Sequence, residues 1–352
     1  MSATAVHVVT DWIKMSADGG AALGELDVLG IGNAIVDVLA HTSDDVILSH
    51  GLPKGSMTLI DAERADALYV DIGASLEISG GSGANTIAGA ASFGADVAFI
   101  GKVRDDKLGD TFSRDIRGTG ALFQTAPLTQ GPGTARCLIM VSPDGQRTMS
   151  TYLGAAVELG PEDIDTEVVG RAKVTYLEGY LWDPPRAKEA FRTAMAAAHA
   201  RNRRVALTLS DTFCVERHRE EFRALVENDV DILFANEEEV RALYEVATLE
   251  EALAAVRGRC DIVAVTRSEK GSLVSSDGNF HEVSAEPVET IVDTTGAGDS
   301  YAAGFLYGLT HGLDLPLCGR LGSIAAAEII SHFGARPQVD LAELAAPVLA
   351  AR

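Results

Sequence analysis

The chain has 352 residues, of which 47% are hydrophobic and 23% charged, so it can bury a large core and is not a disordered protein. The 29 Lys and Arg residues face 51 Asp and Glu residues, which gives a formal net charge of −22. This acidic balance disfavours broad contact with nucleic acid or with an anionic membrane, whereas a locally positive pocket could still bind a small anion.

The first 24 residues show no clear periodicity, and we expect a loosely ordered tail at 1–24 and one folded α/β domain at 25–352. No signal-peptide pattern and no membrane-spanning stretch is visible, which predicts a cytoplasmic protein. The cysteines are far apart and lack C-x-x-C spacing, as is typical of small core residues in a reducing compartment. They are Cys137, Cys214, Cys260 and Cys318.

Short runs rich in β-branched residues recur along the chain and predict buried strands. They lie at residues 27–31, 97–100, 174–177, 205–209, 232–235 and 262–265. Helical spacing of apolar residues follows between them, most clearly at 187–199, 237–244 and 249–256. This alternation predicts a mostly parallel sheet with helices on both faces.

One segment interrupts the alternation. Residues 134–141 and 146–153 predict two strands, and Ser142-Pro143-Asp144-Gly145 between them suits a type I turn. A hairpin does not fit inside a parallel sheet, so we expect it to project from the main body. We predict a small β-rich lid built from about 38–60 and 121–154.

The most specific motif is the glycine-rich string at residues 293–299, Asp-Thr-Thr-Gly-Ala-Gly-Asp, followed by a small, apolar helical pattern to about His311. A helix N-terminus with glycines presents unpaired N–H groups that can bind phosphate. Asp299 in the first turn would be costly beside a phosphate unless it accepts a proton from an attacking hydroxyl group. The alternative for so short a string is a glycine-rich turn with Asp as the helix cap.

A second glycine-rich turn, at residues 80–85, opens another predicted helix and carries Asn85 in its first turn. Asn33 and Asp37 follow the first predicted strand, at the strand end where α/β sheets bind ligands. Together these three side chains favour a pocket for a polyol or a ribose, although Asn85 alone would be read as a helix cap.

Three further segments carry weaker signals. Asn236 and Glu239 have the spacing of a capping box, and their alternative role is to organise Mg²⁺ and phosphate through water. Arg147 follows the predicted lid turn, where it is either a solvated surface residue or a group that stabilises a transferring phosphoryl group. The segment from Thr266 to Gly271 either borders a nucleotide or forms a simple hairpin turn.

Other catalytic motifs are missing from the sequence. There is no Walker A string, no G-x-S-x-G elbow and no cluster of histidines with metal-ligand spacing. The segment that begins at Gly30 starts like a dinucleotide fingerprint but has Ile35 in place of the third glycine.

Taken together, these motifs resemble the ribokinase-like (PfkB) family of sugar and nucleoside kinases, over nearly the whole chain from Asp27. The 293–299 string matches that family's C-terminal signature in full, and the 80–85 turn matches its N-terminal signature. Ile87 stands where a small residue is usual, and Arg104 replaces a glycine common among the sugar kinases. Segments 179–182 and 209–213 resemble those that present aromatic side chains to the purine in adenosine kinases.

The resemblance implies a ribokinase-like α/β fold and a role for each motif. Asp299 would be the catalytic base, and the N–H groups of Gly296, Ala297 and Gly298 would form the anion hole. Arg147 would reach the phosphates, and a monovalent cation such as K⁺ would bind Asp293 and the carbonyl of Thr295. The residues that would contact the ribose are Asn33, Asp37, Gly81 and Asn85. The base would contact Tyr180 and Phe213, with Trp182 a third candidate. ATP and Mg²⁺ would lie near Asn236, Glu239, Thr266 and Gly271.

The implied function is an ATP- and Mg²⁺-dependent kinase that phosphorylates the 5′-hydroxyl of adenosine. A kinase of ribose, fructose or a related sugar is the alternative in the same class. A dinucleotide-dependent dehydrogenase is disfavoured by Ile35, and a catalytically silent nucleotide-binding protein by the intact 293–299 string. The expected partners are ATP and a small acceptor, with no nucleic acid and no membrane, in a monomer or a homodimer.

Overall fold

The computed structural model describes residues 14–15, 21–22, 24–73, 76–276 and 278–351. The predicted tail at 1–24 therefore falls largely outside the described residues. Within it, β1 (Lys14–Met15) and β2 (Ala21–Ala22) pair in antiparallel fashion.

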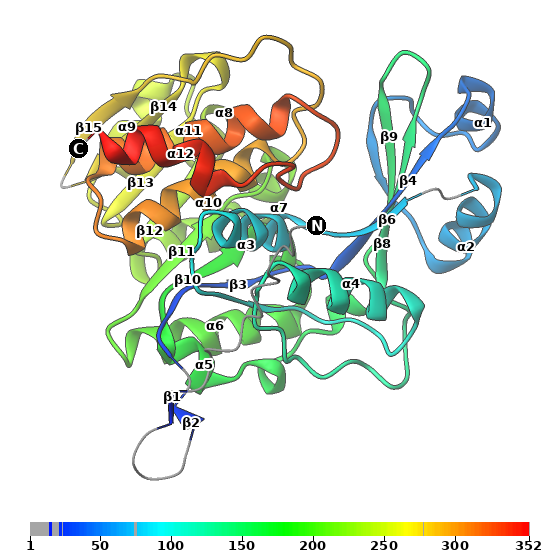
Figure 1. The fold of residues 1–352 in the computed structure, drawn as a ribbon, viewed down its shortest axis with the longest axis horizontal. Helices are drawn as coiled ribbons and strands as arrows, with labels where there is room; N and C mark the ends of the chain where they lie inside the picture. Colours follow the sequence, from blue (N-terminus) through cyan, green and yellow to red (C-terminus); the bar gives the residue numbers. More distant parts are fainter. Residues whose placement is uncertain (1–13, 16–20, 23, 74–75, 277, 352) are drawn as a thin grey trace, which may run out of the picture.

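The main sheet has eight strands and forms the centre of the molecule (Figure 1). From one edge to the other they are β15 (Asn279–Val283), β14 (Ser272–Ser276), β13 (Ile262–Thr266), β12 (Ile232–Asn236), β11 (Arg204–Thr208), β10 (Ala172–Glu178), β3 (Leu26–Ile31) and β7 (Val97–Ile100). Strands β13 to β7 are parallel, and β14 and β15 run antiparallel to them. The predicted mostly parallel sheet is confirmed.

Helices cover both faces of this sheet. Successive residues of a buried strand point to opposite sides, so both faces carry apolar side chains that the helices bury. Val28 packs into one core and Leu29 into the other. The first core is covered by α3 (Ser82–Ser92), α4 (Lys107–Gly118), α10 (Ala297–Thr310), α11 (Leu315–Ile330) and α12 (Leu341–Ala350). The second is covered by α5 (Thr166–Arg171), α6 (Pro185–His199), α7 (Thr212–Asn228), α8 (Glu237–Tyr244) and α9 (Leu249–Val256).

Short 3₁₀ turns connect several of these elements, at Gly154–Glu158, Pro161–Asp163, Gly179–Trp182 and Ser268–Lys270. No helix among the described residues is long and apolar enough to cross a membrane. Cys137, Cys214 and Cys318 are buried, and Cys260 is half-buried.

A second, five-stranded sheet stands beside the main body (Figure 1). Its strands, in spatial order, are β5 (Met57–Leu59), β9 (Arg147–Tyr152), β8 (Ala135–Val141), β4 (Ile35–His41) and β6 (Leu76–Gly80). Helices α1 (Asp44–Ser49) and α2 (Ala62–Asp71) lie on its outer side, away from the main body. The predicted hairpin is confirmed as β8 and β9, closed by a hydrogen bond from Gly145 N to Ser142 O.

The predicted limits of this small sheet need correction. It begins at Ile35 and takes in β6, so its first part extends well past residue 60. Residues 121–134 contribute no strand to it, because Ala121 and Phe123 pack into the core of the main body. An isolated apolar residue in a loop does not show from sequence which of two sheets it will pack against.

The two faces of the small sheet differ in environment. Val36, Val38 and Leu138 point into the core shared with the flanking helices. Asp37 and Leu39, by the alternation of a strand, lie on the opposite face, and cross-strand register places Arg147 there too. This second face is the one that bears the predicted site residues.

Candidate active site

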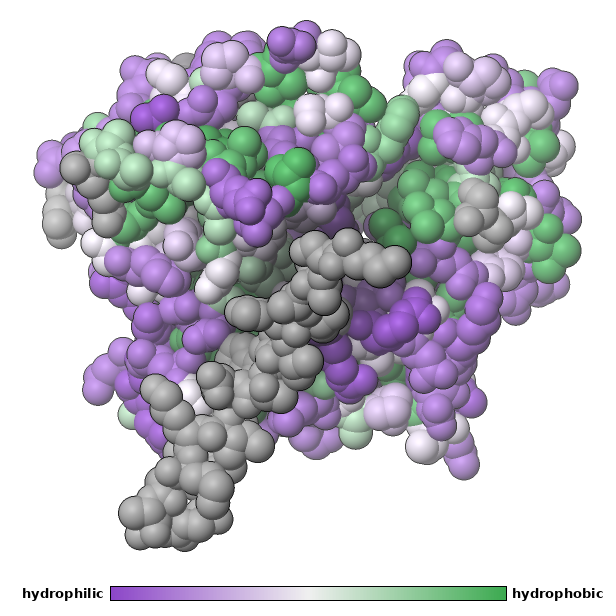
Figure 2. Space-filling model, in the orientation of Figure 1, coloured by the Kyte–Doolittle hydropathy of each residue, from purple (hydrophilic) through white to green (hydrophobic). Residues whose placement is uncertain are grey.

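The carboxyl ends of the parallel strands meet at one edge of the main sheet, and several of them end in a polar residue or are soon followed by one. Asn33 follows β3, Glu178 ends β10, and Asn236 and Thr266 end neighbouring strands. The glycine-led N-termini of α3 and α10 lie at the same place, joined by hydrogen bonds between the two helices. Figure 2 shows the surface hollowed between the main body and the small sheet.

Helix α10 begins at the predicted glycine-rich string. Gly296 is its N-cap with φ of 80°, and a Cβ there would lie 2.6 Å from the Ala335 Cβ, so only glycine fits. Of the three amides predicted as the anion hole, Ala297 N donates to Thr294 O at 3.2 Å. Gly296 N and Gly298 N have no acceptor among the described residues, so these two remain available to an anion.

Asp299 is held by two side chains from the first turn of α3. Ser82 Oγ donates to Asp299 Oδ1 at 2.6 Å, and Asn85 Nδ2 donates to Asp299 Oδ2 at 3.1 Å. Removal from water raises the pKa of Asp299 above its usual range, while these two hydrogen bonds and the charge of Arg336 act in the opposite direction. A carboxylate in this setting can accept a proton from a hydroxyl group placed between the two helices.

Gly81, at the N-cap of α3, has φ of 93°, and a Cβ at this position would lie 2.3 Å from the backbone oxygen of Asn33. The close approach lets the turn after β3 touch the start of α3. It explains in physical terms why glycine is required at residue 81, and it places Asn33 and Asn85 on neighbouring segments.

Glu178 is a buried carboxylate at this contact. Its oxygens accept hydrogen bonds from Asn33 Nδ2 at 2.6 Å, Asn33 N at 3.2 Å and Gly83 N at 2.8 Å. Burial raises the pKa of Glu178 to about 7, although these hydrogen bonds favour the charged form. Glu178 was not among the predicted site residues; its charge at the end of a buried strand is the sequence signal that could have found it.

Arg147 reaches from the small sheet to the loop before α10. Its Nη1 lies 2.7 Å from Asp293 Oδ2, and its guanidinium group packs over the ring of Phe333. Both partners of this ion pair are buried, and Arg147 Nε and Nη2 have no hydrogen-bond acceptor among the described residues. These two unpaired donors have the chemistry to bind a phosphate group, and the ion pair holds Arg147 at Asp293, three residues before the N-cap of α10.

The same ion pair bears on the predicted monovalent cation. The Asp293 carboxylate also accepts hydrogen bonds from Thr295 N at 3.1 Å and Gly334 N at 3.3 Å. With Arg147 as a third partner, most of the acceptor sites of this carboxylate are occupied within the protein. The monovalent-cation site at Asp293 and Thr295 stays a prediction.

Asp37 lies on the cleft-facing side of β4, with no hydrogen-bond partner among the described residues. Removal from water raises its pKa to about 6, and the positive charges of Arg336 and Arg147 oppose that rise. Arg336 comes from the irregular segment between α11 and α12, where no sequence signal marks it, and it was not among the predicted site residues.

The three aromatic candidates have different environments. Trp182 is 1% exposed and packs against Phe191 and Phe222, so its predicted role in contacting a base was wrong and it is a core residue. Phe213 is 60% exposed in the first turn of α7, with the Arg217 guanidinium group 4.2 Å from its ring centroid. Tyr180 is half-buried, and its hydroxyl donates to Ser210 O at 3.3 Å.

The residues predicted to lie near ATP and Mg²⁺ are at neighbouring strand ends, but most of their side chains already form hydrogen bonds within the protein. Asn236 and Glu239 form a capping box in which both Glu239 oxygens accept hydrogen bonds from Asn236. Burial raises the pKa of Glu239 to about 7. Thr266 ends β13, and Gly271, with φ of 77°, closes the tight connection to β14, so this segment forms a hairpin turn.

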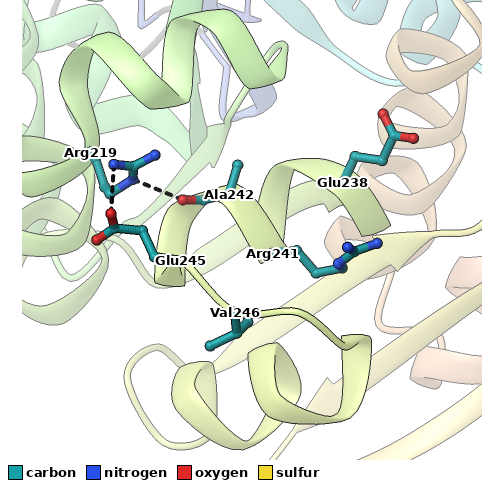
Figure 3. Close-up of a pocket in the computed structure, with 6 residues that line it drawn as sticks. All are labelled: Arg219, Glu238, Arg241, Ala242, Glu245 and Val246. Carbon is teal, nitrogen blue, oxygen red and sulfur yellow. Dashed lines mark hydrogen bonds and ion pairs between the residues drawn. The ribbon is translucent and has the colours of Figure 1, made fainter.

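A separate pocket of about 320 Å³ lies between α7 and α8 (Figure 3). Arg219 there pairs with Glu245 and donates to the carbonyl oxygen of Ala242. None of the predicted site residues lines this pocket, and its charges are partly satisfied internally. No group of three or more His, Cys, Asp or Glu side chains among the described residues is placed to hold a metal ion.

Comparison with known proteins agrees with this geometry. The model of the family described as pfkB family carbohydrate kinase matches residues 59–341. The crystal structure of adenosine kinase from Sinorhizobium meliloti is 52% identical with a TM-score of 0.86, over 92% of this chain and 100% of that one. A probable sugar kinase from Rhizobium etli is 49% identical with a TM-score of 0.86, over 93% and 99%. A cytidine kinase from Thermococcus kodakarensis is 29% identical over 285 residues, 79% of this chain and 97% of that protein.

Proposed function

Since the chain belongs to the PfkB family of carbohydrate kinases, we propose that it transfers the γ-phosphoryl group of ATP to the 5′-hydroxyl of adenosine, giving AMP. The observation that carries the proposal is the Asp299 carboxylate, which lies at the N-terminus of α10 and is oriented by Ser82 and Asn85. This arrangement places a proton acceptor beside amides that can bind the phosphate to be transferred.

In the proposed reaction, Asp299 accepts the proton of the 5′-hydroxyl group as its oxygen attacks the γ-phosphorus. The amides of Gly296 and Gly298, at the positive end of the α10 dipole, stabilise the negative charge of the transferring group. Arg147, held in place by Asp293, directs its two free guanidinium donors to the same charge.

Mg²⁺ bound to the phosphates of ATP would neutralise part of their charge. Glu239 is the acidic side chain that the sequence predicts near Mg²⁺, but both its oxygens already accept hydrogen bonds from Asn236. We therefore propose that Asn236 and Glu239 act on the metal through water and shape the strand ends. Thr266 and Gly271 would border the nucleotide through their backbone.

The choice of adenosine rests on apolar surface that a sugar does not need. On the cleft-facing side of the small sheet, Leu39, Ile139 and Met149 stand opposite one another on adjacent strands. Met57 and Leu76 extend this row at its two ends and are 45% and 50% exposed. An apolar row of this width, with Tyr180 and Phe213 on the main body, suits a flat base.

A sugar kinase remains the second candidate, because the hydroxyl-binding groups Asn33, Asp37 and Asn85 serve a free sugar equally well. The similarity to a probable sugar kinase at 49% identity favours keeping it. The two proposals differ in whether the base contributes binding energy.

The test is kcat/KM for adenosine, cytidine, ribose and fructose in one preparation, with ATP consumption without acceptor as the blank. We expect adenosine to be the best acceptor and ribose to be poor. If either sugar outperforms adenosine, the nucleoside proposal is wrong and the sugar-kinase proposal stands.

A matched pair of variants tests the base contact. Phe213→Ala should weaken adenosine binding by about 1–3 kcal/mol, the usual range for base stacking on an aromatic ring, and leave ribose turnover unchanged. Phe280→Ala is the control, because Phe280 also lies beneath an arginine, Arg257, but far along the chain on β15. Equal effects of the two variants would remove Phe213 from the base site.

A further inference from the structure

Arg336 connects three parts of the site that no sequence motif joins. Its Nε donates to Ser79 O at 3.2 Å and its Nη2 to Ser79 Oγ at 3.1 Å, at the end of β6. Its Nη1 donates to Ala84 O at 2.9 Å, in the first turn of α3. These three bonds span the turn whose next residues, Ser82 and Asn85, hold Asp299.

The same guanidinium group faces two carboxylates. Its positive charge lowers the pKa of both Asp37 and Asp299, and those carboxylates in turn favour the charged form of Arg336. Removal from water is the larger effect on Arg336 and lowers its pKa to about 10, so the side chain stays charged at neutral pH. Asp37 has no hydrogen bond among the described residues, so the charges of Arg336 and Arg147 are its electrostatic compensation.

We infer that Arg336 is a positioning residue of the proposed kinase site, which fixes the turn between β6 and α3 and keeps Asp37 and Asp299 ionised together. The inference rests on the proposed function, because it assigns Arg336 to the carboxylates that would hold and deprotonate the acceptor. Arg336 does not touch the reacting atoms; it acts through the two carboxylates and through the segment that orients one of them.

Other charged groups also act on these carboxylates and must be considered with Arg336. The acidic ones raise the proton affinity of the site, and Arg147 opposes them. Glu178 from β10, Glu239 from α8, Tyr176 from β10 and Tyr180 from the turn that follows it interact with Asp299. Cys137 from β8 and Arg147 from β9 interact with Asp37, and Asp115 from α4 interacts with Arg336 itself. Burial keeps the two tyrosines neutral, so the negative charge comes from the carboxylates. Loss of Arg336 removes a cation that opposes this charge, so the proton affinity of Asp37 and Asp299 rises.

The test is the pH profile of kcat/KM in three variants. Arg336→Gln removes the charge but retains a side-chain donor toward Ser79 and Ala84. Arg336→Lys retains the charge but loses the planar fork. Ser79→Ala removes one hydrogen bond and leaves the charge in place.

We expect the acidic limb of the Arg336→Gln profile to move to higher pH. Its loss relative to the wild type should be about tenfold greater near pH 6 than near pH 9, the size of effect that a nearby opposite charge commonly produces. Arg336→Lys and Ser79→Ala should keep the wild-type limb, with kcat reduced a few-fold at every pH. A uniform loss in Arg336→Gln at all pH values would overturn the proposal, because it would indicate a structural role alone.

The role of Arg336 can be tested even if the Arg336→Gln variant does not fold. If Arg336→Gln does not fold, the wild type and Arg336→Lys remain, and the proposal requires their acidic limbs to coincide. A displaced limb in Arg336→Lys overturns it.

A measurement without turnover separates this inference from the proposed function. Asp37 has a raised pKa in the folded protein, so folding stability falls as pH rises from about 4 through 6, and loss of Arg336 extends this fall to higher pH. The difference in unfolding free energy between wild type and Arg336→Gln should therefore grow from pH 4 to pH 8, while that for Ser79→Ala stays constant. If no acceptor is phosphorylated, the proposed function fails, and this pH trend still decides the role of Arg336; a constant difference overturns it.

Discussion

The N-termini of α3 and α10 share a backbone conformation but differ in the hydrogen bonds of their donor groups. Each begins on a glycine with positive φ and no side-chain cap. At α3, the donors form hydrogen bonds within the protein: Gly83 N donates to Glu178, and the Ser82 hydroxyl donates to Asp299. At α10, Gly296 N and Gly298 N have no acceptor among the described residues.

In the proposed kinase, this difference would let one site hold carboxylates and still receive phosphate. The positive end of the α3 dipole stabilises the protein's own acidic groups, so their charge would not repel the ligand fully. The α10 end would then bind a charge that comes from outside, with Arg147 paired to Asp293 three residues before Gly296. On this proposal, hydrogen bonds within the protein satisfy the α3 end, and the ligand completes the α10 end.

The largest effect is expected from removing the carboxylate that joins the two helix ends. Asp299→Asn should lower kcat by about 10²- to 10⁴-fold, because the amide cannot accept the proton of the acceptor. The shape is nearly unchanged, so urea unfolding should resemble that of the wild type. Normal turnover in a folded Asp299→Asn protein would rule out Asp299 as the base.

The second-largest effect on kcat is expected from the loss of the Arg147 side chain. Arg147→Ala should reduce kcat by about 10²-fold while changing the KM for the acceptor much less, because its proposed partner is phosphate charge. Arg136→Ala is the matched control, since Arg136 lies on the opposite face of the same sheet and pairs with Asp66. Similar kcat values for the two variants would contradict the assignment.

A backbone change at the N-terminus of α3, whose donors are hydrogen-bonded within the protein, should mainly affect the free energy of unfolding. Gly81→Ala places a Cβ 2.3 Å from Asn33 O at a positive φ, which should cost about 2 kcal/mol or more in unfolding free energy. Gly118→Ala in α4 meets no atom within 4 Å and should be neutral or stabilising by up to about 1 kcal/mol. Urea denaturation of both variants decides, and equal stabilities would contradict this reading of the turn.

The smallest effect is a pH dependence at the satisfied end. The folded-state pKa of Glu178 is about 7, above the value of about 4.5 for an exposed glutamate, so its contribution to stability is lost as pH rises through that window. Glu178→Gln removes this loss, so its stability relative to the wild type should improve as pH rises from about 4.5 to about 7. The exposed Glu269→Gln variant should show no such trend, and a flat difference for Glu178→Gln would refute the prediction.

The sequence predicted the elements well because their signals are local. The strand runs at 97–100 and 262–265 and the helices at 237–244 and 249–256 agree with the structure to within one residue. The hairpin turn and the capping box of Asn236 also depend only on residues a few positions apart. Periodicity, turn chemistry and capping are physical preferences of short segments, and the sequence displays them directly.

The candidate site could be predicted only in part, because half of its contacts join distant segments. Asn33, Asp37 and Asp299 are marked by their places after a strand or at a helix start. Their partners Glu178 and Arg336 sit among unremarkable neighbours, and nothing local distinguishes Trp182 in the core from Phe213 at the surface.

What the sequence by itself determined is therefore the order of strands and helices, the two glycine-led helix starts and the polar residues beside them. Only the tertiary structure decided which charges meet: Arg147 with Asp293, Glu178 with the start of α3, and Arg336 with the turn between β6 and α3. The reason is that burial and ion pairing depend on how the two sheets and their helices close around the cleft. That closure is a property of the whole packed chain, and no segment of the sequence encodes it alone.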